Sequence, residues 1–131
     1  MRTASIALLA AFPLVACVAG PGPAEASPAE PAALVGTWTV DLRPTPDAEP
    51  YSKTFVVERV EGRTLEGSFY DSTLSDGHVN ADWGAVHFAF TTRDGAGEYH
   101  TAGVLEGGRL RGTTHAVGRG FLAVWSAERA R

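Results

Sequence analysis

The fold is decided by residues 85–105, AVHFAFTTRDGAGEYHTAGVL. Apolar and polar side chains alternate over Ala85–Thr92 and again over Glu98–Leu105. This period of two residues is typical of β-strands that bury one face. Between the two segments, Asp94-Gly95 favours a tight turn. The stretch therefore predicts an antiparallel β-hairpin.

Similar segments on both sides of this hairpin extend the prediction to eight strands. All eight prolines lie at or before Pro50, whereas glycine recurs between the later apolar segments, which is the composition of a strand meander. The expected strands are Val35–Arg43, Lys53–Val60, Thr64–Asp71, His78–Asp82, Ala85–Thr92, Glu98–Leu105, Arg109–Val117 and Gly120–Glu128. The last strand is apolar on both faces, and we expect Phe121, Ala123 and Trp125 to point inward.

The pattern E-G-x-x-L-x-G-[ST] occurs twice, at residues 61–68 and 106–113. It predicts two equivalent hairpins, in which the Glu-Gly pair supplies a turn with positive φ and the later glycine points into a crowded, coiled sheet. Eight antiparallel strands with short links close most simply into a barrel, because closure leaves no sheet edge. We therefore expect an all-β protein with a single eight-stranded antiparallel up-and-down barrel after a disordered N-terminal segment. An open β-sandwich is the alternative.

Residues 1–16 have the composition of a signal peptide. Arg2 gives a short basic start, and the apolar stretch of residues 4–15 is too short to span a bilayer as a helix. The stretch ends in Leu14-Val15-Ala16-Cys17, and Cys17 is the one cysteine of the chain, so no intramolecular disulfide can form. The Pro- and Ala-rich residues that follow cannot bury enough apolar surface to fold and are expected to form a tether.

The run from Leu14 to Cys17 resembles the lipobox of bacterial lipoproteins. The resemblance implies that a diacylglycerol is attached to the Cys17 thiol and that cleavage leaves Cys17 at the N-terminus. The predicted organisation is a signal peptide at 1–16, the lipidated cysteine and its tether at 17–34, and a β-barrel domain at 35–131. The chain is then exported and lipid-anchored in the cell envelope, and Val18, which is not Asp, favours the outer membrane in a bacterium that has one. An ordinary signal peptide, cut at Ala16 or Ala19, is the alternative.

Gly36-Thr37-Trp38, near the start of the domain, resembles the G-x-W motif of lipocalins and other calycins. In these proteins an arginine from the end of the last strand packs across the Trp and closes the base of the barrel. The resemblance gives this role to Arg129, with Arg131 as the alternative. The chain has no second lipocalin motif and no C-terminal helix, so the resemblance implies a calycin-like barrel but no particular ligand.

Strand order also predicts what lies at each end of the barrel. The longer links meet at one end: Pro44–Ser52, Ser72–Gly77, Arg93–Gly97 and the turn at Gly118. The other end holds the short links Glu61–Arg63, Trp83–Gly84 and Glu106–Gly108, together with both termini. Long loops favour an open mouth. We therefore expect the tether to join the closed base, and the mouth to face away from the membrane.

The inward aromatic side chains are candidates for lining a pocket. They are Phe55, Phe69, Phe88, Tyr99, Phe121 and Trp125. Because an eight-stranded barrel has room for its own side chains or for one small ligand, a ligand pocket and a filled core are both open at this point. Arg119, between two glycines at the mouth, is placed either to face an anionic ligand or to be an exposed turn residue.

Metal binding and catalysis find little support. If Gly107-Gly108 is a two-residue turn, His100 lies opposite His115, and with His78 nearby these are weak candidate metal ligands. A three-residue turn breaks that pairing, and strand alternation places all three on the solvent face. We therefore predict no metal site, no cofactor and no enzyme activity.

The composition also bears on partners. The net charge of −4 argues against nucleic acid as a partner. The expected function is that of an exported, membrane-anchored lipoprotein that binds a small apolar or amphipathic molecule without catalysis. A structural or interaction lipoprotein of the cell envelope, with a side-chain-filled barrel, is the alternative.

Overall fold

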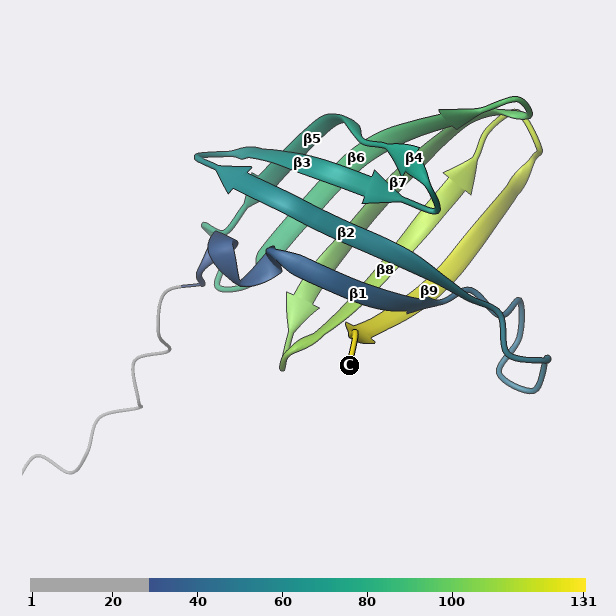
Figure 1. Cartoon of the computed structure of the whole chain (residues 1–131), viewed down its shortest axis with the longest axis horizontal. Helices are drawn as coiled ribbons and strands as arrows, with labels where there is room; N and C mark the ends of the chain where they lie inside the picture. The colour runs from purple at the N-terminus through teal and green to yellow at the C-terminus, as the bar shows by residue number, and fades with distance from the viewer. Residues whose placement is uncertain (1–28) are drawn as a thin grey trace, which may run out of the picture.

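The structure is a computed structural model that describes residues 29–131. The predicted signal peptide, the lipidation site Cys17 and the predicted tether up to residue 28 lie outside these residues. The described chain is a closed barrel of eight antiparallel strands, as the sequence predicts (Figure 1). Its main strands are β1 (Gly36–Asp41), β2 (Ser52–Glu61), β3 (Thr64–Phe69), β5 (Ser75–Asn80), β6 (Val86–Asp94), β7 (Gly97–Glu106), β8 (Arg109–Ala116) and β9 (Phe121–Arg129). A two-residue strand, β4 (Ser72–Thr73), adds to β3.

Closure of the barrel rests on β1, which pairs with β2 on one side and β9 on the other. Trp38, for example, lies opposite Phe55 of β2 and opposite Arg129 of β9. The remaining strands follow in chain order, so the topology is up-and-down. The sandwich alternative is wrong, because every main strand has a partner on both sides and the sheet has no free edge.

Two links differ from the sequence prediction. β6 runs on to Asp94 and β7 starts at Gly97, so the link expected to be long is a tight turn at Gly95-Ala96. The Asp94 carboxylate holds this turn by accepting a hydrogen bond of 2.8 Å from the Ala96 amide. β5 also starts earlier than predicted, at Ser75. The one long link at the mouth is therefore residues 42–51.

The repeated E-G-x-x-L-x-G pattern forms two equivalent hairpins, as predicted. Both are two-residue turns, with Gly62 at φ +59° and Gly107 at φ +58°. The later glycine of the second copy, Gly112, points inward, where a Cβ atom would lie 2.4 Å from the ring of Trp125. That spacing is closer than real carbon contacts allow, so this position requires glycine unless the indole moves.

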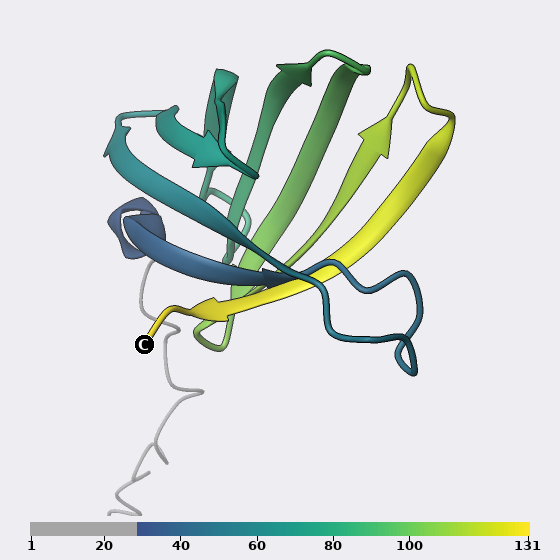
Figure 2. The same cartoon turned by 45° about the vertical axis from the view of Figure 1, so that its right-hand side comes forward.

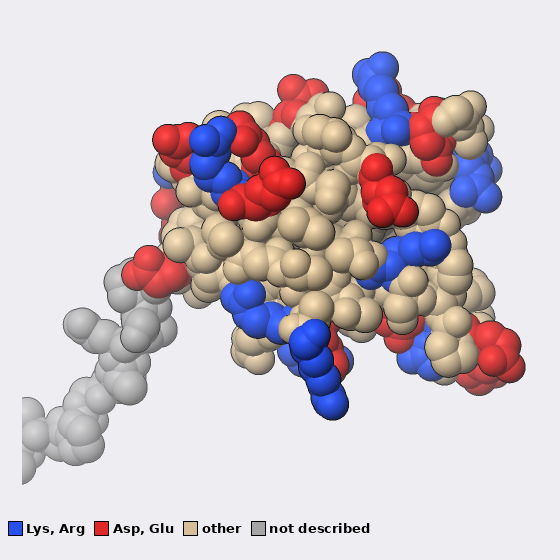
Figure 3. All heavy atoms as spheres, in the orientation of Figure 1, with Lys and Arg blue, Asp and Glu red and all other residues tan. Residues whose placement is uncertain are grey.

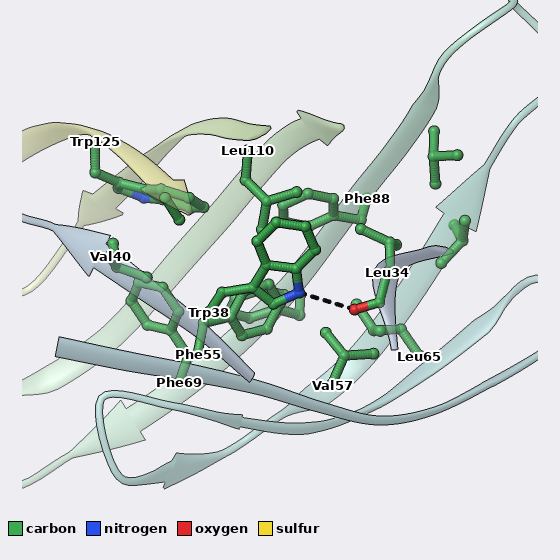
Figure 4. Packing of buried hydrophobic residues seen from close by; sticks show 14 residues of the cluster. Leu34, Trp38, Val40, Phe55, Val57, Leu65, Phe69, Phe88, Leu110 and Trp125 are labelled. Atoms are coloured by element: carbon green, nitrogen blue, oxygen red, sulfur yellow. Dashed lines mark hydrogen bonds between the residues drawn. The ribbon is translucent and has the colours of Figure 1, made fainter. Parts of the chain in front are cut away.

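The core is a cluster of aromatic and aliphatic side chains along the inner face of the strands (Figure 4). The ring centroids of Phe55 and Phe90 lie 5.2 Å apart, and those of Phe69 and Trp125 lie 5.6 Å apart. Three polar groups are buried with them but are satisfied: the hydroxyls of Thr101 and Thr114 are 2.9 Å apart, and the Trp125 indole donates to Thr114 at 3.0 Å. The interior of the barrel around these residues is therefore filled by the protein's own side chains.

A short 3-10 helix, η1 (Pro31–Leu34), lies against the base of the barrel. Leu34 has no exposed surface, and its carbonyl accepts a 2.9 Å hydrogen bond from the indole of Trp38 (Figure 4). Ala29 also packs against the core. The folded domain thus begins before residue 35, although the sequence analysis assigned residues up to 34 to the tether. The difference arises because Leu34 supplies the apolar side chain that covers the end of the core.

The two ends of the barrel have different contents. The C-terminus, η1 and the β7–β8 turn share one end, which we call the base (Figure 2). The β6–β7 and β8–β9 turns lie at the opposite end, the mouth (Figure 2). Acidic and basic side chains are mixed over the face seen in Figure 3 rather than separated by sign. Within residues 29–131, no helix has the length and hydropathy needed to cross a bilayer.

Candidate binding site

The mouth contains a cavity of about 360 Å³. Its wall is formed by the links after β1, β3 and β8 and by the mouth ends of the adjoining strands. Its apolar lining residues are Leu42, Pro44, Phe69, Phe121 and Ala123, and its polar lining residues are Tyr51, Tyr70, Ser72, Thr92, Asp94, Tyr99, Thr114 and Arg119. A cavity of this size falls in the lower part of the range occupied by small-molecule sites. The mouth can therefore accept one small molecule.

The six aromatic residues proposed from the sequence as pocket lining divide into two groups. Phe69, Tyr99 and Phe121 line the cavity. Phe55, Phe88 and Trp125 are buried deeper in the barrel, where they pack against one another and against Phe69. The two alternatives left open by the sequence thus coexist, because the base half is filled and the mouth half holds a void.

Asp94, Tyr99 and Arg119 form a charged and polar group at the rim. Asp94 accepts hydrogen bonds from the Ala96 amide and, at 2.9 Å, from the Tyr99 hydroxyl. The first of these bonds, followed by the second and by attraction to Arg119, lowers the pKa of Asp94 below its ordinary value. Asp94 is consequently a carboxylate at neutral pH. Arg119 lies over the ring of Phe121, with its guanidinium carbon 4.9 Å from the ring centroid.

A second cation, Lys53 of β2, lies at the rim with two phenols, Tyr51 just before β2 and Tyr70 just after β3. The hydroxyls of Tyr51 and Tyr70 are hydrogen-bonded to each other. This bond raises the pKa of Tyr51, so the phenol stays neutral. The ammonium of Lys53 lies 4.6 Å from the ring centroid of Tyr70 and 5.3 Å from that of Tyr51. These contacts position a positive charge beside the phenols by cation–π attraction.

Trp38 and Arg129, the predicted barrel-closing pair, lie together at the base. The guanidinium carbon of Arg129 is 4.4 Å from the centroid of the Trp38 ring. The same guanidinium donates to the carbonyl of Ala33 and, at 3.1 Å, to the carbonyl of Val35. Arg129 therefore ties the entering chain to the indole that fills the base.

The histidines lie on the outer surface. Gly107-Gly108 is a two-residue turn, and His100 is directly opposite His115 across β7 and β8. Both are exposed, as is His78 of β5, which pairs with Ala89 of β6 and does not lie opposite either of them. Within residues 29–131, no group of three or more His, Cys, Asp or Glu side chains is arranged to hold a metal ion.

A larger depression of about 760 Å³ lies on the outer wall, where the loop after β1 stands beside β7, β8 and β9. Its lining includes Thr113, Val124 and Ser126 on the outward face of the strands. This depression is an open surface groove that does not enclose a molecule, whereas the mouth cavity is walled on several sides. We therefore place the candidate site at the mouth.

Several lining residues were not singled out from the sequence. Tyr51 could have been, because it is in phase with Lys53 and Phe55 and so points to the inner side of β2. Tyr70 could not, because strand alternation after the inward Phe69 places it outside. Its φ of +52° departs from strand geometry and turns the chain, so that the phenol joins the rim.

The fold and the site define a small, closed antiparallel β-barrel with a filled base and a single-molecule cavity at the mouth. No protein-family model matches the chain, and neither the comparison with curated proteins nor that with solved structures gives a significant match.

Proposed function

We propose that the protein is a non-catalytic binding module that takes one small apolar or amphipathic molecule into the mouth of its barrel. The observation that carries this proposal is the cavity of about 360 Å³, which continues the aromatic core and ends in a polar rim. Burial of an apolar group against Phe69 and Phe121 supplies the driving force. The rim phenols and charges supply hydrogen-bonding groups for a polar end.

A neutral apolar probe tests this function. N-phenyl-1-naphthylamine, whose emission rises in apolar surroundings, is titrated into the full chain carrying Cys17→Ala, which excludes an attached acyl chain as a competitor. We expect saturable binding at one site. Ala123→Phe, which fills the cavity from β9, should abolish it, whereas Val124→Phe on the outer face of the same strand should not. Equal binding to both variants, or no saturable binding, refutes the proposal.

We further propose that the chain is exported and anchored through a lipid on Cys17. The support is the lipobox-like run before Cys17 and the entry of the described chain at the base of the barrel, beside Trp38 and Arg129. That arrangement also supports the resemblance to lipocalin-like barrels. With the anchor at the base, the mouth faces away from the membrane.

Detergent phase separation of cells that express the chain tests the anchor. The wild-type chain should enter the detergent phase and have the mass of a lipidated, cleaved N-terminus. Cys17→Ala should move to the aqueous phase. A wild-type chain that stays in the aqueous phase, or whose mature N-terminus lies elsewhere, contradicts lipidation.

The second candidate is a structural or interaction lipoprotein that acts through its outer wall. It is favoured by two apolar side chains on the outward face of β9, Leu122 at 61% exposure and Val124 at 71%. Contiguous exposed apolar side chains are typical of contact surfaces. Failure of the probe to bind at the mouth would make this the preferred function.

A further inference from the structure

We propose that the mouth cavity selects molecules that carry a carboxylate on a short apolar tail, and that Arg119 binds the carboxylate. The inference rests on the proposed binding function and adds the charge and orientation of the ligand. The tail lies inward against the apolar lining, and the head group stays at the rim.

Arg119 belongs to the wall of the cavity, where it lies in the link between β8 and β9. It lines the void and stacks on Phe121 of β9, which fixes its guanidinium on that side of the mouth. It also hydrogen-bonds to the Tyr99 hydroxyl of β7 and attracts the Asp94 carboxylate of β6.

Apart from a hydrogen bond to the Tyr99 hydroxyl, the five N–H donors of Arg119 are available to a ligand. Within residues 29–131, Arg119 forms no ion pair, whereas most of the other arginines do. The nearest acid, Asp94, already uses one oxygen for the Ala96 amide and the other for the Tyr99 hydroxyl. A planar guanidinium can donate two parallel hydrogen bonds to one carboxylate. A ligand carboxylate would therefore be an ion-pair partner for Arg119.

The cations near the rim also favour an anionic ligand. Among the lining residues Arg119 is the one cation and Asp94 the one carboxylate, and Lys53 is a further cation beside the lining phenols. Lys53 is held beside Tyr51 and Tyr70 and adds a positive field on the opposite side. The whole chain carries a net charge of −4, so attraction of an anion to the mouth depends on these two cations.

The wall below the rim suits an apolar tail. Leu42, Phe69, Phe121 and Ala123 face the void. The Thr114 hydroxyl at its floor is not free to bind a head group, because it bonds to Thr101 and accepts from the Trp125 indole. A polar head placed beside Thr114 would lose hydrogen bonds to water that this hydroxyl does not replace. The head group therefore belongs at the rim.

Octanoate and 1-octanol, which share a tail and differ in charge, test the inference. Each displaces N-phenyl-1-naphthylamine from the full chain carrying Cys17→Ala. We expect octanoate to bind more tightly than octanol, and Arg119→Gln to weaken octanoate by about tenfold or more, as expected for loss of a charged hydrogen bond. Octanol affinity should change little. Arg93→Gln, which removes an equal charge from the outward face of β6, is the matched control and should leave both affinities unchanged.

The outcomes separate this inference from the function on which it rests. If octanoate and octanol bind alike, or Arg119→Gln weakens both equally, the carboxylate preference is wrong while small-molecule binding stands. If Arg93→Gln weakens octanoate as much as Arg119→Gln does, the effect is long-range and the assignment of Arg119 is wrong. If the neutral probe does not bind at all, the binding function itself fails.

Discussion

Leu34 is the residue whose replacement most directly tests where the folded domain begins. The residue is fully buried, and its side chain covers the base of the core beside Trp38. Leu34→Ala removes three buried carbon groups at about 0.8 kcal/mol each, or about 2.4 kcal/mol in transfer free energy. The void left behind adds to this, although η1 lies at a chain end and can partly collapse into it. We therefore expect a loss of about 3 kcal/mol in the free energy of unfolding.

Urea denaturation followed by tryptophan fluorescence measures this loss, because Trp38 and Trp125 are both buried in the native barrel. Val35→Ala is the control, since Val35 is 40% exposed and its truncation should cost less than about 1 kcal/mol. The midpoint should shift with little change in the slope of the transition. A Leu34→Ala variant within about 1 kcal/mol of wild type would show that η1 contributes little, and that the domain begins at residue 35 after all.

Three other predictions concern the barrel interior, the rim and the base. Gly112→Ala should destabilise the barrel by about 1–3 kcal/mol through overpacking, whereas Gly95→Ala, where a Cβ atom meets nothing within 4 Å, should have a small effect in the same urea experiment. Hydrogen bonds lower the pKa of Asp94 from its ordinary 3.8. Its carboxylate therefore stabilises the fold above that pH and loses this effect as the pH falls through the lowered pKa. Wild type should thus be more stable than Asp94→Asn at pH 7, and this difference in the free energy of unfolding should vanish in acid. Arg129→Gln should lower the free energy of unfolding by about 1 kcal/mol, because it removes the cation–π contact and the hydrogen bonds at the base. If Arg129 alone closes the base, Arg131→Gln should leave the thermal unfolding temperature unchanged.

The sequence predicts the barrel well because strand alternation and glycine turns are local signals. The inward positions of Phe88 and Leu110 follow from the period alone. The phase of the last strand, which is apolar on both faces, and the length of the turn at Gly107 are fixed only by the pairing with neighbouring strands. The same signals placed Leu34 in a tether, because a single apolar residue after a proline-rich stretch has no period to reveal its partner. Its burial is decided by tertiary contact with the open base.

The candidate site was predicted only in part for a similar reason. Phe69, Tyr99 and Phe121 share the phase of the inward strands and were identified. Tyr70 reaches the rim through a backbone conformation outside the strand region, which alternation cannot anticipate. The boundary between filled core and void depends on the volumes of side chains from many strands, and no local pattern encodes it.

The strand that closes the barrel is also the strand nearest to the N-terminal segment. A force applied through that segment acts along β1, which is hydrogen-bonded lengthwise to β2 and to β9. Such a pull loads the two ladders in shear, so their bonds must fail together instead of opening one after another. If the chain is held by its N-terminus at a surface, tension enters the barrel at the base through β1, a strand that is hydrogen-bonded on both sides.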